Sequence, residues 1–161
     1  MDNLTPAQRS YMMSRVRSKD TQPELIVRKL AHARGLRFRK HCKYLHGCPD
    51  LVFARARLVV FVDGDYWHGW RFSTWSSKLT TYWKDKIENN RRRDQRNFRR
   101  LRRQGWVVLR IWEHEVKRDA SGCVDRIQAA LRLQARNASV GVVTWGKSYH
   151  GSTAISRTTR A

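Results

Sequence analysis

The chain has 161 residues, 40% of them hydrophobic and 29% charged, which is typical of one folded domain and excludes a disordered chain. Its 34 lysines and arginines against 13 aspartates and glutamates give a net charge of +21, which indicates a polyanionic partner, above all nucleic acid. An anionic membrane would attract the same charge, but no apolar run approaches the roughly 20 residues of a spanning helix and the start of the sequence lacks a signal-peptide core, so we expect a cytoplasmic protein without membrane contact.

Two short helices are predicted at the start of the chain. The first covers residues 6–16. The second begins after a cap at Asp20 or Thr21, has Pro23 in its first turn, and ends before Gly35. Its apolar face, which we expect to pack on a sheet, consists of Leu25, Ile26, Leu30 and Ala33.

Three strand patterns follow the second helix. Residues 36–40 alternate apolar and basic side chains, as an edge strand does, and a loop follows them. Residues 50–53 and 58–62 are rich in branched and aromatic side chains and flank Ala-Arg-Ala-Arg, which predicts a β-hairpin centred near position 56.

The hairpin brings two carboxylates to one end of the sheet. Antiparallel partners have numbers that add to a constant, so a centre near 56 places Asp50 opposite Val62 or Asp63. Asp50 and Asp63 are therefore predicted to meet.

A long helix over residues 80–104, ended by Gly105, follows a loop of aromatic residues at 64–75. Its buried stripe carries apolar side chains at helical spacing, together with the polar residues Asn90 and Asp94. The apolar members of the stripe are Trp83, Ile87, Phe98 and Leu101. The other faces carry eight arginines, namely Arg91, Arg92, Arg93, Arg96, Arg99, Arg100, Arg102 and Arg103.

A buried strand at 106–112 and an amphipathic helix at 124–133 complete the predicted core. The inward side of that helix consists of Val124, Ile127, Ala130 and Leu131. We expect one domain over residues 1–136 and a loosely ordered basic tail over 137–161, with one weak strand at 140–145.

Asp50, Asp63 and His68 form the most informative group of candidate catalytic residues. Phosphodiester hydrolysis needs a hard cation, and carboxylate oxygens are its preferred ligands. His68 follows Asp63 closely in sequence and has an ordinary pKa near neutrality, which suits proton transfer. The alternative is structural, with the two aspartates capping strands and turns and His68 packed as a hydrogen-bonded core residue.

Aromatic and basic residues around this group suggest contact with DNA. Tyr66, Trp67, Trp70 and Trp75 either stack on bases or plug the core, and we favour DNA contact for Tyr66 and Trp67. Between residues 91 and 103 only Asp94 opposes the arginines, so phosphate contact is a better explanation than a solvated face. If they neutralise six to ten phosphates, affinity should fall by roughly three to five powers of ten from low to moderate salt.

At these residues the chain resembles the very short patch repair endonucleases, a branch of the PD-(D/E)XK nuclease superfamily. The resemblance runs from about Met12 to Arg132, and several spaced motifs in the right order make it specific. These motifs are Met12-Met13-Ser14, Asp20-Thr21, Glu24, Pro49-Asp50, FVDGDYWHG, YWKDKIENNRRRD and GWVVLRIWEHE.

The resemblance implies an enzyme that uses magnesium to nick one strand of duplex DNA beside the thymine of a T:G mismatch. By position, Asp50 would be the central magnesium ligand and the backbone carbonyl of Val62 the second. His68 would be the general base, and Glu24 would hold a water on the metal. The aromatic wedge inserted beside the mismatch would consist of Tyr66, Trp67 and Trp83.

The chain departs from the family pattern in two places. Asp63 stands where the family has histidine, and it either joins the site, which we favour, or pairs with an arginine. The positions of the family's structural zinc site hold no thiolate, so we expect no zinc. Those positions are Asp65, Trp70, Phe72 and His114, and we expect packing of Trp70, Phe72 and Trp75 to hold the loop instead.

The sequence thus predicts an α/β fold with a PD-(D/E)XK core, in which a central mixed sheet is flanked by helices. We expect a monomeric, magnesium-dependent nicking endonuclease acting on mismatched duplex DNA. The predicted catalytic residues are Glu24, Asp50, Asp63 and His68, and the DNA-binding residues are Tyr66, Trp67, Trp83, Lys86, Arg91, Arg92, Arg93 and Arg96. The rival functions are a restriction-like or resolvase-like nuclease of other specificity and a DNA-binding protein that has lost catalysis.

Overall fold

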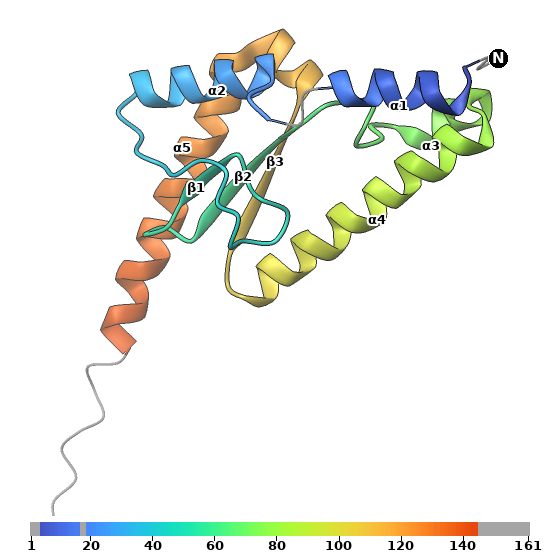
Figure 1. Ribbon diagram of the computed structural model, residues 1–161. Helices are drawn as coiled ribbons and strands as arrows, with labels where there is room; N and C mark the ends of the chain where they lie inside the picture. Colours follow the sequence, from blue (N-terminus) through green and yellow to red (C-terminus); the bar gives the residue numbers. More distant parts are fainter. Residues whose placement is uncertain (1–3, 17–18, 145–161) are drawn as a thin grey trace, which may run out of the picture.

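A mixed β-sheet with helices on both faces forms the centre of the molecule in the computed structural model, which describes residues 4–16 and 19–144 (Figure 1). The elements in chain order are α1 (Pro6–Arg15), α2 (Gln22–Ala33), β1 (Leu51–Phe53), β2 (Leu58–Asp63), α3 (Phe72–Trp75), η1 (Ser76–Lys78), α4 (Thr81–Arg103), β3 (Val107–Trp112) and α5 (Glu113–Thr144). The predicted α/β class, with a mixed sheet between helices, is confirmed. None of the helices in the described part of the chain is long and apolar enough to cross a bilayer.

The sheet has the order β1-β2-β3, so β2 is its central strand. β1 and β2 form the antiparallel hairpin, while β3 runs parallel to β2 in a register that places Asp63 beside Trp112. Parallel neighbours require a long crossover, and α4 supplies it. The carboxyl ends of β2 and β3 therefore lie at the same edge of the sheet.

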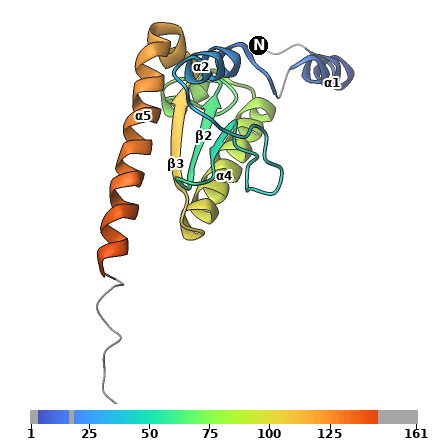
Figure 2. The same cartoon turned by 90° about the vertical axis from the view of Figure 1, so that its left-hand side faces the viewer.

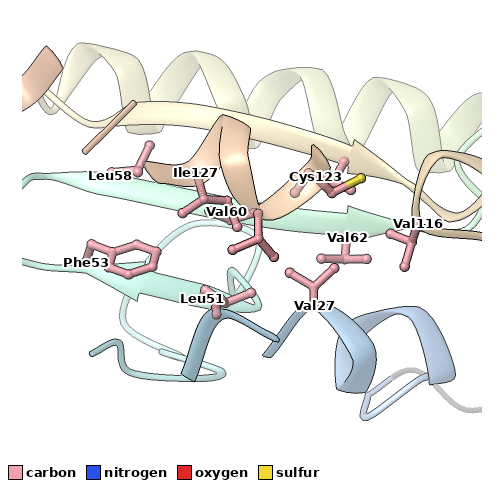
Figure 3. Packing of buried hydrophobic residues seen from close by; sticks show 12 residues of the cluster. Val27, Leu51, Phe53, Leu58, Val60, Val62, Val116, Cys123 and Ile127 are labelled. Carbon is pink, nitrogen blue, oxygen red and sulfur yellow. The ribbon is translucent and has the colours of Figure 1, made fainter. Parts of the chain in front are cut away.

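Alternate residues of the strands fill two cores. On one face, Val60 and Val62 pack against Val27 of α2 and Ile127 of α5, as Figure 3 shows. On the other face, Val59 packs with the aromatic and aliphatic side chains of α4. Figure 2 shows the resulting layers, with α5 on one side of the sheet and α4 on the other.

The predicted edge strand at residues 36–40 is reduced to a single bridge. Arg39 pairs with Val52, and the two residues exchange backbone hydrogen bonds of 2.9 and 2.7 Å. His41 adopts a φ of 49°, which turns the chain away from β1 directly after the bridge. The alternating pattern instead directs Phe38 into the core, where its ring meets that of Phe53 at 5.8 Å.

The hairpin forms with a register one residue away from the predicted one. Leu51 lies opposite Val60, so Asp50 falls opposite Phe61 rather than opposite Val62 or Asp63. The turn closes between Ala54 and Arg57 through a hydrogen bond of 3.1 Å, with Arg57 at a φ of 47°. Asp50 nevertheless reaches Val62 through its side chain.

The end of the chain is more helical than predicted. α5 begins at Glu113, bends at Asp119 and continues to Thr144, so it replaces the weak strand predicted at 140–145 as far as its residues are described. The Asp119 carboxylate accepts a hydrogen bond of 2.8 Å from the backbone N–H of Gly122, which restarts the helix after the bend. Residues 145–161, most of the predicted tail, lie outside the described residues.

Candidate active site

A cavity of about 1010 Å³ opens where α2, the carboxyl end of β2, the aromatic loop and α4 meet. Its wall contains all the predicted catalytic and metal-binding residues and three of the predicted DNA-binding residues. These are Glu24, Asp50, Val62, Asp63, Trp67, His68, Lys86 and Arg93. Tyr66, Trp83, Arg91, Arg92 and Arg96 are not part of the wall.

Asp50 directly precedes β1 and follows the buried Pro49. Its Oδ2 accepts a hydrogen bond of 2.7 Å from the backbone N–H of Val62, which ties the carboxylate to the central strand. Burial raises the pKa of Asp50 to about 8, and the negative charges of Glu24 and Asp63 act in the same direction. Burial and negative charge thus outweigh the hydrogen bond from Val62 and the positive charge of Arg28, which act to lower this pKa.

Glu24 lies in the first turn of α2 and is only 3% exposed. Its Oε1 accepts a hydrogen bond of 2.8 Å from the hydroxyl of Thr21, and its Oε2 accepts one of 3.0 Å from the backbone N–H of Asp20. The segment predicted to cap α2 therefore holds the Glu24 carboxylate at the edge of the cavity.

His68 is held from both sides of its ring. Nδ1 lies 2.6 Å from Oδ2 of Asp94, and Nε2 lies 3.4 Å from Oδ1 of Asp63. Burial works to lower the pKa of His68, but the hydrogen bond to Asp94 and the charge of Asp63 outweigh it, so the pKa is raised. The sequence allowed either a hydrogen-bonded structural histidine or a catalytic histidine at this position. The contact with Asp94 agrees with the first role, and the location beside Asp63 in the cavity agrees with the second.

The backbone of the aromatic loop needs glycine beside His68. Gly69 has a φ of 67°, and a Cβ there would come within 2.6 Å of the Arg91 side chain and 3.2 Å of Ile87. The tight approach of the loop to α4 therefore depends on the missing side chain.

Asp63 pairs with an arginine that the sequence analysis did not assign. The Nε of Arg110 donates a hydrogen bond of 2.6 Å to Oδ2 of Asp63. The guanidinium lies 4.0 Å above the Trp112 ring and 5.3 Å from that of Phe98. Burial raises the pKa of Asp63, while the nearby charges of His68 and Arg110 counteract that effect. Asp63 thus forms the ion pair with an arginine that was one of its two expected roles. It also remains beside His68 in the cavity.

The aromatic residues of the loop divide between exposed and buried positions. Four aromatic rings contact one another in a row. The ring centroids lie 5.4 Å apart for Trp75 and Tyr66, 4.9 Å for Tyr66 and Trp67, and 5.8 Å for Trp67 and Trp83. Tyr66 is 41% exposed, whereas Phe72 is 4% exposed. Tyr66 is thus open to solvent and Phe72 is packed in the core, while contact of the loop with DNA stays a prediction.

The positions of the family's zinc site are joined by other contacts. Nδ1 of His114 lies 2.7 Å from Oδ1 of Asp65, and the rings of Trp70 and His114 lie 4.6 Å apart. The indole N–H of Trp75 donates a hydrogen bond of 2.8 Å to the carbonyl of Trp70. These contacts supply the packing expected of the loop, and the absence of zinc stays a prediction.

The arginines of α4 lie in two environments. Arg92, Arg93 and Arg96 are exposed and line a shallow depression of about 580 Å³ on the same helix. Arg91 is half-buried, and its guanidinium lies 5.0 Å from the Phe72 ring. The exposed set therefore offers positive charge next to the cavity, while Arg91 also supports the loop.

Three polar residues of the site had no role assigned from the sequence. Asp94 and Asn90 are the polar members of the α4 stripe, and the Asn90 side chain donates a hydrogen bond of 3.2 Å to the carbonyl of Trp67. Arg110 interrupts an otherwise apolar strand. In each case the signal was a polar residue at a position that the hydrophobic pattern places toward the core.

Comparison with known proteins places this chain in a family. The family model described as DNA mismatch endonuclease Vsr matches residues 1–74. A type II nicking enzyme of Xanthomonas oryzae pv. oryzae is 48% identical over 117 residues, which cover 71% of this chain and 86% of the relative. A type II nicking enzyme of Neisseria meningitidis serogroup C is 39% identical over 135 residues, covering 82% of this chain and 91% of the relative.

The DNA mismatch endonuclease Vsr of Escherichia coli is 36% identical over 110 residues, which cover 66% of this chain and 70% of the relative. The resemblance to very short patch repair endonucleases is confirmed by these matches. The chain therefore belongs to the Vsr family and is a DNA endonuclease.

Proposed function

We propose that this endonuclease uses magnesium to nick one strand of duplex DNA beside the thymine of a T:G mismatch. The observation that carries the proposal is the meeting of Glu24, Asp50, Asp63 and His68 in one cavity, beside the exposed arginines of α4. Carboxylates supply ligands for a hard cation, the histidine supplies a proton acceptor, and the arginines supply charge for phosphates. The mixed sheet with its helices agrees with a PD-(D/E)XK core.

The residues around Asp50 fit a divalent cation. Buried and half-buried carboxylates line the cavity, and burial, together with the repulsion of Glu24 and Asp63, raises the pKa of Asp50 to about 8. A cation held by the Asp50 carboxylate and the Val62 carbonyl would relieve that repulsion, and both ligands are hard oxygens. When bound, magnesium would polarise the scissile phosphate and activate the attacking water.

The remaining steps belong to side chains of the chain itself. With Asp94 accepting a hydrogen bond from Nδ1, the Nε2 atom of His68 is the nitrogen left to accept a proton. Asp63, at 3.4 Å from Nε2, stabilises the imidazolium that forms. Glu24, in the wall of the same cavity, orients water, and Lys86 and Arg93 attract the phosphate.

The aromatic loop is the proposed reader of the mismatch. Tyr66 and Trp67 lie on the loop that also carries His68, and Trp83 supports Trp67 through their ring contact. Unstacking a mismatched base pair costs less free energy than unstacking a correctly matched one. Insertion of these rings therefore favours mismatched DNA. The same loop then couples insertion to the placement of His68.

The test is cleavage of two end-labelled duplexes that differ only by one T:G mismatch. The protein and Mg²⁺ are added, and the products are resolved on a denaturing gel. A nick beside the mismatched thymine alone is the expected result. Equal cleavage of both duplexes supports a restriction-like or resolvase-like nuclease, and binding without cleavage supports a DNA-binding protein.

We also propose that the chain acts as a monomer, since one cavity contains the whole set of predicted catalytic residues. Analytical ultracentrifugation with and without duplex DNA tests this, and a dimer on DNA would contradict it.

A further inference from the structure

Arg28 is a buried cation next to the cavity, with 7% of its surface exposed. It lies one turn after Glu24 on α2, and its Nη2 donates a hydrogen bond of 2.7 Å to Oε2 of Glu24. Its Nη1 donates one of 2.7 Å to Oδ1 of Asp20 and lies 3.4 Å from Nε2 of His41. Its Nε donates one of 3.3 Å to the Glu24 carbonyl. The guanidinium is thus held at each of its nitrogens.

The partners of Arg28 have the composition of a metal site. Among the described residues, Asp20, Glu24 and His41 each offer a ligand atom, and the three atoms lie within 4.8 Å of one another. Arg28 contacts all three, so a positive charge that belongs to the chain already lies among them. Unlike an ion, this charge cannot dissociate, and the planar guanidinium fixes the direction of each hydrogen bond.

This arrangement determines the position of Glu24. The hydroxyl of Thr21 binds one carboxylate oxygen, while Arg28 and the backbone of Asp20 bind the other. Glu24 in turn acts on Asp50 through its charge, and Arg28 opposes that effect. Arg28 therefore influences the proposed magnesium ligand although it does not line the cavity.

We propose that Arg28 is a positioning residue of the nicking reaction, whose guanidinium occupies the place of a second cation among Asp20, Glu24 and His41 and thereby fixes the Glu24 carboxylate. The positioning part rests on the proposed function, because it requires Glu24 to act in catalysis. The statement that Arg28 occupies the place of a cation does not rest on the proposed function, because it concerns only which cation Asp20, Glu24 and His41 hold.

Two measurements test the proposal on the full chain. The first is the number of Mn²⁺ ions bound per DNA-free protein, measured from the free Mn²⁺ signal in electron paramagnetic resonance. The second is the single-turnover nicking rate at saturating Mg²⁺ on the mismatched duplex. Arg28→Ala should bind one Mn²⁺ more than the wild type and nick at least about tenfold more slowly, since small displacements of catalytic groups cost this much or more. A loss of fold alone would not produce more bound metal together with less activity.

Conservative and control variants make the result specific. Arg28→Lys keeps a positive charge, so it should bind the wild-type number of Mn²⁺ ions and nick at an intermediate rate. Arg34→Ala is the matched control, because Arg34 ends the same helix and pairs with Asp125 without lining the cavity. It should leave both measurements unchanged.

The proposal is overturned if a folded Arg28→Ala variant keeps either the wild-type Mn²⁺ number or the wild-type rate. Asp20→Asn provides a second route if that variant does not fold, because the Asp20 side chain is 54% exposed. It should slow nicking without changing the Mn²⁺ number, whereas loss of one Mn²⁺ would show that the group holds a metal in the wild type. A wild-type chain that does not nick contradicts the proposed function, and the Mn²⁺ numbers still test the occupancy.

Discussion

Nδ1 of His68 lies 2.6 Å from Oδ2 of Asp94, so the general base proposed on the aromatic loop is bound to the buried side of α4. One turn earlier on the same helix, Asn90 binds the carbonyl of Trp67. Two neighbouring loop residues, the proposed general base and a residue proposed to contact DNA, are therefore positioned by a single helix.

Asp94→Asn should slow nicking by about 10²–10⁴-fold, the usual contribution of a positioned acid–base group. The amide cannot stabilise the imidazolium as a carboxylate does, and it permits the wrong ring nitrogen to carry the proton. Single-turnover rates measure the effect, and DNA affinity should be unchanged. Glu88→Gln, which removes a half-buried carboxylate of the same helix that lies outside the cavity wall, is the control. An Asp94→Asn rate equal to that of the control would contradict the role of Asp94.

Asp50→Ala should abolish nicking while leaving duplex affinity largely intact, because the carboxylate is proposed to hold magnesium and not to bind DNA. Gel shifts in Ca²⁺ measure affinity, and denaturing gels in Mg²⁺ measure nicking. Unchanged metal-dependent cleavage would remove Asp50 from the mechanism.

Without metal, Asp50 should make the fold less stable as pH rises. Its folded pKa of about 8 exceeds the ordinary value of 3.8, so between these values the folded chain holds a proton that the unfolded chain has released. The free energy of unfolding contributed by this group falls across that range. Asp50→Asn should therefore raise the melting temperature in EDTA more at pH 8 than at pH 5, and Mg²⁺ should stabilise the wild type at pH 8. A melting-temperature difference independent of pH would contradict the electrostatic account of this site.

Asp63→Asn should shift the acidic limb of the pH–rate profile to lower pH. The Asp63 charge raises the pKa of His68, while the charge of Arg110 lowers it. Removal of the carboxylate deletes one of the effects that raise the pKa and leaves that of Asp94, so His68 becomes neutral at lower pH than in the wild type. The profile of kcat/KM between pH 5 and pH 9 measures the shift. A shift to higher pH would exclude His68 as the titrating base.

Arg96→Ala should weaken binding to mismatched and matched duplexes equally. An exposed arginine on α4 that contacts one phosphate releases about one counterion from the DNA. In the variant, the steepness of the decrease of log K with log salt should therefore be smaller by about one. Arg136→Ala on α5, which packs on the opposite face of the sheet, should change neither affinity nor slope. A change of Arg96→Ala affinity confined to the mismatched duplex would mean that Arg96 reads bases.

The sequence predicted the parts of the fold that depend on hydrophobic periodicity. The long apolar stripe from Ile87 to Leu101 determined α4, and the dense apolar run before Trp112 determined β3. Periodicity could not determine the hairpin register, because it depends on Arg57 adopting a positive φ in the turn. It also missed the first part of α5, where only Val116 and Cys123 are buried before the regular pattern begins.

The candidate site was predicted as a set of residue types and not as a set of contacts. Asp50, Asp63 and His68 were found because they are polar residues at the end of a hairpin. Their partners Asp94 and Arg110 lie on elements far along the chain, and which partner each one binds depends on how α4 and β3 pack. Such pairings follow from the tertiary structure, so spacing along the sequence does not contain them.

The two sides of α4 carry different tasks, and helix geometry fixes the angle between them. Asn90 and Asp94 bind the loop, while Arg92, Arg96 and Arg99 line the neighbouring depression, which Asn90 also borders. Each residue added to an α-helix rotates the later turns of that helix by about 100° relative to the earlier ones. An insertion or deletion of one residue between Asn90 and Arg99 would thus rotate the arginines that we propose to contact phosphates away from their place beside the cavity. Relatives that cut DNA with this arrangement should therefore tolerate many substitutions on α4 but no change in its length between these residues.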